Sequence, residues 1–266
     1  ISNITRTSGA ALHIIGYKNK SWIGNITIGD YGSGSNTMYD GIIFEHTNVT
    51  YLNTFNIYCT HDGILIHGGV GNTQPDSSDL FVDNGFVIGA NNNIHVAGGF
   101  GGLYLNNTLV FGGTNGFCID NSICIQGNRE IMISNTCCFD GANYALMLLN
   151  ETIGSGMFVN CSAFFSGAGY YAPSEQQQYA GNIKIQSFPY GTLNLSSSTI
   201  KGSTGDGIWI NDTTSKVFIS ESVEIAYNAV GVNNFNNSTY LYCHGMLHDN
   251  TTHDFYGTYS PSITPY

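Results

Sequence analysis

Short segments in which apolar and polar residues alternate recur along almost the whole chain. Eight of them align without gaps over ten positions, beginning at Val49, Leu80, Leu103, Ile131, Met157, Leu193, Val217 and Tyr240. A weaker ninth begins at Lys20. Positions 1, 3, 7 and 9 are mostly apolar and positions 4 to 6 are small or polar, although Lys201 falls on an inward position. Because alternation with a period of two is typical of strands that bury one face, each segment predicts two short strands joined by a bend.

A third short apolar run follows each segment at a nearly constant distance. A turn pair such as Asp62-Gly63 precedes it, as in the run Ile64-Leu65-Ile66. Because three short strands recur in every unit of about 23 residues or more, the pattern predicts a parallel solenoid of about nine coils, stacked about 4.8 Å apart. We expect one domain over residues 1–256, whose residues 1–19 continue an upstream coil, and a C-terminal tail over residues 257–266.

Two recurrent units carry a resemblance to a known architecture. One is D-G-I-x-I from Asp206 to Ile210, and the other is L-x-L-x-N-T-x-x-F-G from Leu103 to Gly112. They resemble units of the right-handed parallel β-helix of the pectate-lyase-like superfamily, and the Asn- and Gly-rich chain is most similar to the body of a virus tailspike or tail fibre. The resemblance implies an all-β, right-handed, single-stranded parallel β-helix that associates as a homotrimer. It does not fix the chemistry, because lyases, galacturonases, depolymerases and adhesins share this body.

The catalytic motifs of two subfamilies are missing from the chain. It has no Asp-Asp, Gly-His-Gly or Arg-x-Lys motif, which a galacturonase-like site would carry. The arginines are Arg6 and Arg129 only, and the aspartates are scattered, whereas a calcium-dependent pectate lyase has clustered aspartates and a catalytic Arg or Lys. Both departures weaken the lyase and galacturonase interpretations.

The composition limits the classes of partner. Charged residues make up 9% of the chain, and 7 Lys and Arg against 18 Asp and Glu give a formal net charge of −11. Because no basic stripe can displace counterions from phosphates, we expect no nucleic-acid partner, and no apolar run is long enough to predict membrane insertion. The 7 cysteines have no metal-ligand spacing, so we expect no metal and no cofactor; buried thiols are favoured, with disulfides as the alternative. Frequent Asn-x-Ser/Thr sequons and the low charge predict an extracellular location, secreted or on a virion surface.

Two columns of outward positions are apolar, which is unusual for a solvated sheet face. Positions 2 and 8 of the segments contribute the large side chains Phe81, Tyr104, Phe158, Phe164 and Phe218. An exposed apolar stripe along a rod favours a subunit interface, in agreement with the homotrimer that the resemblance implies. The alternatives are loops that cover the stripe, or a platform on which sugar rings stack.

Acidic residues after the third strand are the candidates for catalysis. Glu45 and His67 are predicted on adjacent coils about 5 Å apart, and Asp120 and Glu151 form a second such pair. Two carboxyl groups at this separation suit a retaining glycosidase, because pairing raises the pKa of one group and leaves it a proton donor. The alternative is that these are ordinary surface acids. Asp62 and its equivalents before the third strand are predicted to cap turns.

Two long insertions fall between the second and third strands, over residues 30–40 and 167–181. The second carries aromatic and amide side chains, which suit neutral sugars through stacking and hydrogen bonds. The substrate-binding candidates are Tyr170, Tyr171, Glu175, Gln177, Tyr179 and the strand residue Trp209. A disordered loop, or one that packs in a trimer, is the alternative.

Together these features predict the body of a virion attachment protein that recognises a host-surface glycan. The first alternative is an endo-acting polysaccharide depolymerase, either glycosidase or lyase, that uses one of the two acidic pairs. The second alternative is a structural shaft or a cell-surface adhesin without catalysis.

Overall fold

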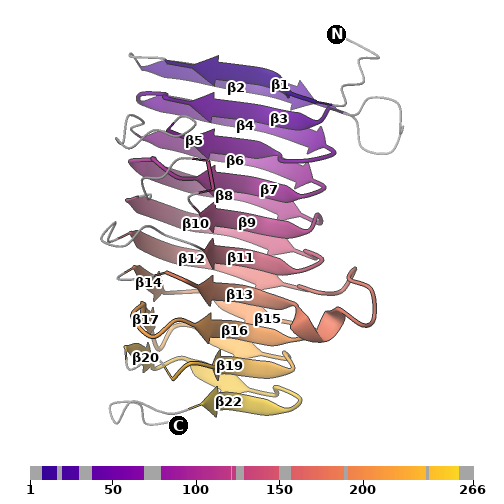
Figure 1. Ribbon diagram of the computed structural model, residues 1–266, viewed down its shortest axis with the longest axis vertical. Helices are drawn as coiled ribbons and strands as arrows, with labels where there is room; N and C mark the ends of the chain where they lie inside the picture. The colour runs from indigo at the N-terminus through magenta and orange to yellow at the C-terminus, as the bar shows by residue number, and fades with distance from the viewer. Residues whose placement is uncertain are drawn as a thin grey trace.

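The computed structural model describes residues 8–16, 20–29, 38–68, 79–120, 122–123, 129–149, 157–188, 191–237 and 240–257. The described residues form an all-β structure with one short 3-10 helix, η1 (Gln177–Tyr179). The strands belong to two sheets that run along the length of the molecule (Figure 1). All of the strand pairs between described strands are parallel.

One sheet contains ten strands, and we call it the short-strand sheet. In their order along the sheet, its strands are β1 (Ala10–Ile15), β3 (Asp40–Glu45), β5 (Ile64–His67), β7 (Asn92–Ala97), β9 (Asn115–Asp120), β11 (Tyr144–Leu149), β13 (Gly181–Gln186), β16 (Asp206–Asn211), β19 (Val230–Asn234) and β22 (His253–Gly257).

The other sheet contains twelve strands, and we call it the long-strand sheet. Its first members are β2 (Ser21–Ile28), β4 (Thr50–Cys59), β6 (Leu80–Gly89), β8 (Gly102–Phe111), β10 (Glu130–Phe139) and β12 (Phe158–Ser166). Towards the C-terminus each long strand is divided in two, giving the pairs β14 (Thr192–Leu195) and β15 (Thr199–Lys201), β17 (Lys216–Ile219) and β18 (Glu224–Ala226), and β20 (Leu241–Cys243) and β21 (Met246–His248).

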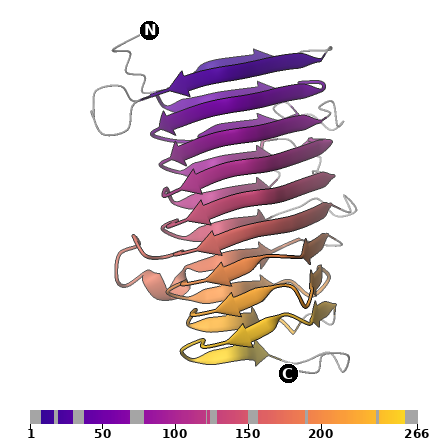
Figure 2. The ribbon, with the colours of Figure 1, turned by 180° about the vertical axis from the view of Figure 1, so that it is seen from behind.

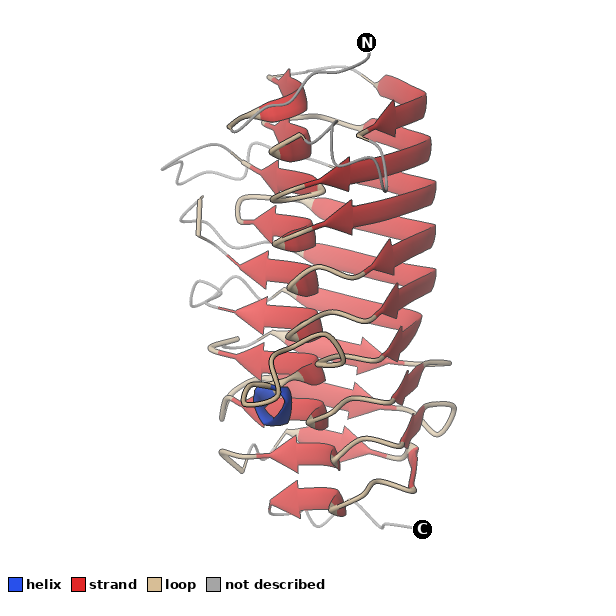
Figure 3. Cartoon of the chain, turned by 90° about the vertical axis from the view of Figure 1, so that its right-hand side faces the viewer, coloured by secondary structure: helices blue, strands red, loops and turns tan. Residues whose placement is uncertain are grey.

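Successive parts of the chain alternate between the two sheets, so one long strand and the following short strand make one repeat. Each strand pairs with its equivalent in the next repeat, and the repeats are stacked along the long axis (Figure 2, Figure 3). The all-β, parallel, repetitive arrangement expected from the sequence is therefore confirmed. The first two strands expected in each repeat are in fact one continuous bent strand from β2 to β12, and they separate only from β14 onward.

A left-handed residue at the bend shifts the alternation within the long strands. Asn84 in β6 and Asn107 in β8 have φ values of 56° and 46°, a region that asparagine adopts more readily than most residues. The side chains after the bend therefore point the opposite way from a simple alternation. Val87 and Val110 are 0% exposed, whereas Leu109 is 37% exposed. The expectation that position 7 is buried and position 8 outward is wrong for these strands.

Strand β12 has one residue fewer at the bend than β10. The register between β10 and β12 shifts at the bend, where Asn135 of β10 (φ 46°) has no partner in β12. Phe164 is consequently on the outer face, as predicted. Lys201 also lies outside, with its Nζ 5.0 Å from the centre of the Phe164 ring, so the inward position expected for it is wrong.

The register also moves several aromatic residues to the outer face. Thr50, rather than Val49, pairs with Leu80, so the segment around β4 is displaced by one position from the sequence alignment. The segments of β2 and β20 are displaced in the same way. The residues transferred from the expected inward column to the column of Phe81 are Trp22, Tyr51 and Tyr242.

A continuous core of aliphatic and aromatic side chains fills the space between the sheets. Buried asparagines satisfy backbone groups at one of its corners: Asn228 Nδ2 donates to the Ile200 and Ala226 carbonyls at 3.2 and 3.1 Å. Thiols contribute to the same interior. The cysteines in the described part of the chain, all of them free thiols, are Cys59, Cys118, Cys137, Cys138, Cys161 and Cys243.

Candidate functional site

Aromatic side chains stack on one another on the outer face of the long-strand sheet. Trp22, Tyr51, Phe81 and Tyr104 come from β2, β4, β6 and β8, where the sheet register pairs each one with the next. The successive ring centroids are 4.2, 4.7 and 4.8 Å apart, and the successive planes differ by 8°, 11° and 13°. We call these stacked rings the aromatic ladder.

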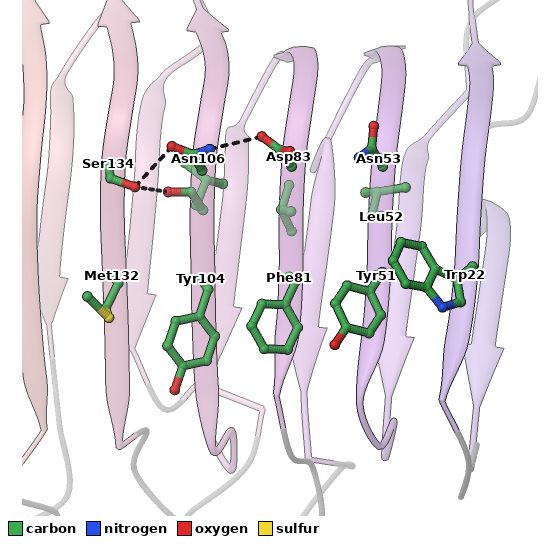
Figure 4. A pocket seen from close by; sticks show the side chains of 12 residues that line it. Trp22, Tyr51, Leu52, Asn53, Phe81, Asp83, Tyr104, Asn106, Met132 and Ser134 are labelled. Atoms are coloured by element: carbon green, nitrogen blue, oxygen red, sulfur yellow. Dashed lines mark hydrogen bonds between the residues drawn. The ribbon is translucent and has the colours of Figure 1, made fainter.

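Parallel aromatic rings at these centroid distances prefer an offset arrangement to a direct face-to-face overlap. Figure 4 shows the rings of Tyr51, Phe81 and Tyr104 side by side along the sheet. Trp22 at the end of the ladder is 73% exposed, and Met132 of β10, which follows Tyr104 in register, is 40% exposed. The two ends of this column of side chains therefore present apolar surface to solvent.

A polar column accompanies the aromatic ladder, two residues further along the same strands. It consists of Asn53, Asp83, Asn106 and Ser134, and we call it the polar ladder. Asn106 Nδ2 donates to Asp83 Oδ1 at 3.1 Å, and Ser134 Oγ donates to Asn106 Oδ1 at 3.2 Å (Figure 4). Because side chains two apart on a strand point to the same face, each repeat offers one apolar and one polar group.

Amide donors surround the carboxylate of Asp83. Asn84 Nδ2 donates to Asp83 Oδ2 at 2.9 Å, and the Nδ2 atoms of Asn106 and Asn107 donate to Oδ1 at 3.1 and 3.3 Å. An ionised carboxylate only accepts hydrogen bonds, so it fixes the direction in which these amides point. Their orientation is thus set before a ligand arrives.

The two ladders line a groove of about 380 Å³ across β2 to β10. Among the described residues that line it, Asp83 is the one ionisable acid, and none is a histidine, cysteine, lysine or arginine. A related hollow occurs near the C-terminus, where Phe218 and Tyr242 stack with centroids 4.9 Å apart beside Ser220 and His244. The chemistry available in the groove is apolar contact combined with hydrogen bonding to side-chain amides, hydroxyl groups and the Asp83 carboxylate.

The residues predicted as a subunit interface do not form one continuous stripe. Phe81 and Tyr104 belong to the aromatic ladder, and Phe218 lies in the same column further on. Between them the column contains Asn160 and Asn194, whose side chains hydrogen-bond to each other at 2.8 Å. Two polar rungs therefore interrupt the apolar surface.

The other two interface candidates lie outside this column. Phe158 is 51% exposed, but it pairs with Glu130 rather than with Met132, so its expected place in the stripe is wrong. Phe164 lies beyond the bend of β12, where its ring is 5.2 Å from that of Phe139. Phe158 and Phe164 therefore lie in two separate apolar patches.

The first pair of predicted catalytic residues lies in the short-strand sheet, away from the groove. Glu45 in β3 and His67 in β5 are register partners, as expected for adjacent repeats. The Glu45 carboxylate, however, contacts His13 Nε2 at 2.9 Å. Burial lowers the pKa of His67, and the negative charge of Glu45 opposes this shift.

The second predicted pair cannot be assembled within the described chain, because Glu151 lies outside the described residues. Asp120 in β9 is described, and its Oδ1 lies 3.2 Å from His95 Nε2. Burial raises the pKa of Asp120, but the hydrogen bond with His95, the positive charge of His95 and the hydrogen bonds from Ser122 together outweigh this, and the pKa falls below the ordinary value.

The loop predicted to bind substrate folds against the short-strand sheet. Tyr170, Tyr171 and Tyr179 are 66, 61 and 70% exposed. The hydroxyl of Tyr144 in β11 donates to the Tyr179 carbonyl at 2.7 Å, which attaches the loop to the sheet. Glu175 is exposed as well. All of these residues lie away from the groove.

The remaining members of that predicted set have partners of their own. Gln177 Nε2 donates to the Ala172 carbonyl at 3.2 Å, so its amide is used within the loop. Trp209 in β16 lies near the loop through Lys184, whose Nζ is 4.8 Å from the Tyr144 ring centre and 5.0 Å from that of Trp209. The structure thus brings Trp209 and the loop to one region.

Sequence reasoning missed Trp22, Tyr51 and the whole polar ladder as functional candidates. A usable signal was present as an aromatic residue followed two positions later by Asn or Asp. It occurs in Tyr51-Leu52-Asn53, Phe81-Val82-Asp83 and Tyr104-Leu105-Asn106. Recurrence of this short pattern in successive repeats indicates two parallel ladders on one face.

Comparison with known proteins finds no matching family model, no similar curated protein and no similar solved structure. In the described part of the chain, no helix has the length and the apolar character needed to cross a membrane.

Proposed function

We propose that this protein binds an extended neutral glycan in the groove between the aromatic ladder and the polar ladder. The observation that carries the proposal is the register of the two ladders, which places an aromatic ring beside an oriented polar side chain in successive repeats. In this proposal the chain is the body of a right-handed parallel β-helix, as in virion attachment proteins. Its ligand is then a glycan of a host surface.

Sugar polymers match both kinds of group in the groove. The C–H faces of a pyranose ring are apolar and suit an aromatic surface, whereas its hydroxyl groups exchange hydrogen bonds with amides and carboxylates. The ladders repeat at the strand spacing of about 4.8 Å. A polymer of repeating units therefore meets one apolar and one polar group again at each step along the sheet.

The groove supports binding rather than cleavage. Hydrolysis of a glycosidic bond ordinarily requires two carboxyl groups on either side of the bond. The described lining contains the single carboxylate of Asp83, and amide donors occupy both of its oxygens. Glu45 and Asp120 lie in the other sheet, and Glu130, whose Oε2 accepts a hydrogen bond from the Tyr104 hydroxyl at 3.2 Å, is not among the described residues that line the groove.

Calorimetric titration of the full chain with neutral and acidic polysaccharides tests this proposal. We expect a neutral polymer to bind, and the double variant Tyr51→Ala/Phe81→Ala to lose at least about tenfold in affinity, the loss of about 1.4 kcal/mol. Phe158→Ala is the matched control, because it removes an exposed ring outside this groove and outside the column of the aromatic ladder. Equal losses in the double variant and in the control, with both still folded by circular dichroism, would overturn the assignment of the groove.

A homotrimer is the second candidate, and the exposure of Trp22, Met132 and Phe218 favours it. Light scattering after size-exclusion chromatography gives the mass of the assembly. A mass of three chains that falls to one chain in Trp22→Asp would support an interface on this face. If the protein is a single chain in solution and binds the polysaccharide, the groove is a glycan-binding site and not a subunit interface.

A further inference from the structure

A cluster of ionisable side chains in the short-strand sheet has the composition of a metal site. His95 in β7 lies between two carboxylates, with Nδ1 2.9 Å from Asp62 Oδ2 and Nε2 3.2 Å from Asp120 Oδ1. Cys118 Sγ is 3.7 Å from Asp120 Oδ2. The cluster is largely enclosed, since the side chains of Asp62 and His95 are 2 and 13% exposed.

The stacking of repeats brings these residues together. His95 and Cys118 are register partners in β7 and β9, and Asp120 follows Cys118 by two residues on the same strand. Their side chains therefore project to one face of the sheet. Asp62 comes from the turn before β5, 33 residues before His95 in sequence.

Asp62 fixes the orientation of the His95 ring. Its Oδ1 accepts hydrogen bonds from Asn91 Nδ2 at 3.2 Å, from the Asn92 backbone N–H at 3.1 Å and from Asn92 Nδ2 at 3.0 Å. Oδ2 then accepts from His95 Nδ1. Because a carboxylate accepts and does not donate, Nδ1 carries the hydrogen and Nε2 is directed at Asp120. Hydrogen bonds of this kind commonly orient a histidine that binds a metal through its other nitrogen.

Ser122 orients the second carboxylate in a similar way. The backbone N–H and the hydroxyl of Ser122 donate to Asp120 Oδ1 at 3.0 and 2.8 Å. This leaves Oδ2 on the side of Cys118. One ligand atom each from His95, Cys118 and Asp120 lies within 4.8 Å of the others. Ligands of one tetrahedral ion lie about 3.3–3.8 Å apart, given bond lengths of about 2.0–2.3 Å, so small side-chain rotations suffice.

We propose that His95 Nε2, Cys118 Sγ and a carboxylate oxygen of Asp120 bind one divalent transition-metal ion, with Zn²⁺ as the best match. A mixed nitrogen, sulfur and oxygen set suits Zn²⁺ and Co²⁺, whereas Ca²⁺ and Mg²⁺ take oxygen ligands. Asp62 and Ser122 are positioning residues. Three protein ligands leave the fourth place of a tetrahedral ion for water or a small ligand.

Metal binding exchanges protons for the ion in this cluster. Burial lowers the pKa of His95, but its hydrogen bonds with Asp120 and Asp62 dominate and raise the pKa to about 9. Burial also raises the pKa of the Cys118 thiol. A metal ion binds a thiolate and a neutral imidazole nitrogen, so its affinity for such ligands increases with pH.

A neighbouring cluster provides an internal comparison. His61 Nδ1 lies 2.8 Å from Asp40 Oδ1 and 3.9 Å from Asp62 Oδ2. This cluster has the imidazole and the carboxylates but no thiol among the grouped residues, and the His61 ring stacks on Tyr39 with centroids 4.5 Å apart. His61→Gln is therefore a matched imidazole control, and Cys59→Ser is a matched thiol control.

Titration of the chelator-treated full chain with Co²⁺ tests the site, because cobalt bound to a thiolate gives a charge-transfer absorption band. We expect one Co²⁺ per chain, this band, and its loss on addition of Zn²⁺. Cys118→Ser should remove the band and weaken Co²⁺ binding at least about tenfold, whereas Asp62→Asn should keep the band and weaken binding by about 10–100-fold. His61→Gln and Cys59→Ser should leave the band unchanged.

The absence of the band in the unaltered protein, or the same band in Cys118→Ser, would overturn the proposal. So would its loss in Cys59→Ser with the fold retained by circular dichroism. Because Cys118 is buried, its substitution can disturb folding. In that event His95→Gln decides: loss of the band with the fold retained by circular dichroism supports the site, and an unchanged band contradicts it.

Discussion

The indole ring of Trp22 stacks on the ring of Tyr51, with centroids 4.2 Å apart and planes 8° apart. β2 is the first described strand of the long-strand sheet, so Trp22 forms the end rung of the aromatic ladder. Its 73% exposure means that its removal opens no cavity in the core. A substitution of Trp22 is therefore expected to change ligand binding with little effect on the free energy of unfolding.

We expect Trp22→Ala to weaken binding of the neutral polysaccharide by about 5–30-fold, which corresponds to about 1–2 kcal/mol. Trp22→Phe should retain most of the affinity, because it keeps a stacked ring on Tyr51. Calorimetric titration measures the affinities, and thermal unfolding monitors the fold. Unchanged affinity in Trp22→Ala would remove this end of the groove from the binding site. A large fall in thermal midpoint would instead assign the stack to stability.

The sequence was sufficient to predict parallel strands stacked repeat on repeat, but not the orientation of every side chain. The alternation around Leu103 and Leu105 correctly predicted buried residues before the bend. Beyond the bend, the left-handed conformation of Asn107 reversed the alternation and buried Val110 instead. A pattern of apolar and polar residues does not reveal a single residue with positive φ. The expectation therefore failed beyond the bends of β6, β8 and β10, whereas Phe55 beyond the bend of β4 is buried as expected.

The candidate sites were predictable to different degrees. Glu45 and His67 were placed as neighbours because the predicted strands stack directly, and the register agrees. The aromatic ladder was partly foreseen through Phe81 and Tyr104, but their role as part of a groove depends on the polar column beside them. The contact of His95 with Asp62 joins a strand residue to a turn residue 33 positions earlier, and no local spacing indicates it.

Thr54 is the one β-branched residue among the described non-glycine residues with positive φ, and its φ is 55°. The equivalent bend residue in β6, β8 and β10 is asparagine. Left-handed conformation costs an ordinary residue about 1–2 kcal/mol, and asparagine less. We expect Thr54→Asn to raise the free energy of unfolding by about 1 kcal/mol, as measured from urea unfolding midpoints.

The reverse change provides the control for that prediction. Asn107→Thr places a β-branched residue at φ 46° and also removes the exposed 3.3 Å hydrogen bond to Asp83 Oδ1, so it should lower the free energy of unfolding by at least a similar amount. Opposite signs for the two substitutions would support backbone strain as the cause. If both substitutions destabilise the protein, the Thr54 hydroxyl, which donates to Asn53 Oδ1 at 2.7 Å, matters more than the backbone.

Gly85 lies against the ring of Phe55, which is 2% exposed in the core. A Cβ atom at Gly85 would overlap the ring atoms of Phe55, so a methyl group cannot be added without displacement. We expect Gly85→Ala to destabilise the protein by about 1–3 kcal/mol through overpacking. In the background of Phe55→Leu the same change should cost less, and a double-mutant cycle measures this coupling. If the two substitutions have additive effects on the free energy of unfolding, the strand rather than the Phe55 ring moves to accommodate the methyl group.

Asp206 at the start of β16 is a half-buried carboxylate whose charge is poorly compensated. Burial raises its pKa from 3.8 to about 6, although Asn233 Nδ2 donates to Asp206 Oδ2 at 3.1 Å and opposes the shift. The carboxyl group of Asp206 therefore binds its proton more tightly in the folded protein than in the unfolded chain. The resulting stabilisation is complete below about pH 3.8 and is lost as the pH rises through about 6.

We expect Asp206→Asn to remove this dependence, because an amide cannot ionise but still occupies the same volume. At pH 7 the variant should be more stable by at most about 3 kcal/mol, since one pKa unit corresponds to about 1.4 kcal/mol and partial exposure reduces the effect. At pH 3.5 the two proteins should differ little. Urea unfolding at a series of pH values measures the difference, which should open between about pH 4 and 6 and remain constant above that range. Parallel stability profiles over this range would show that Asp206 is not the group that binds the proton.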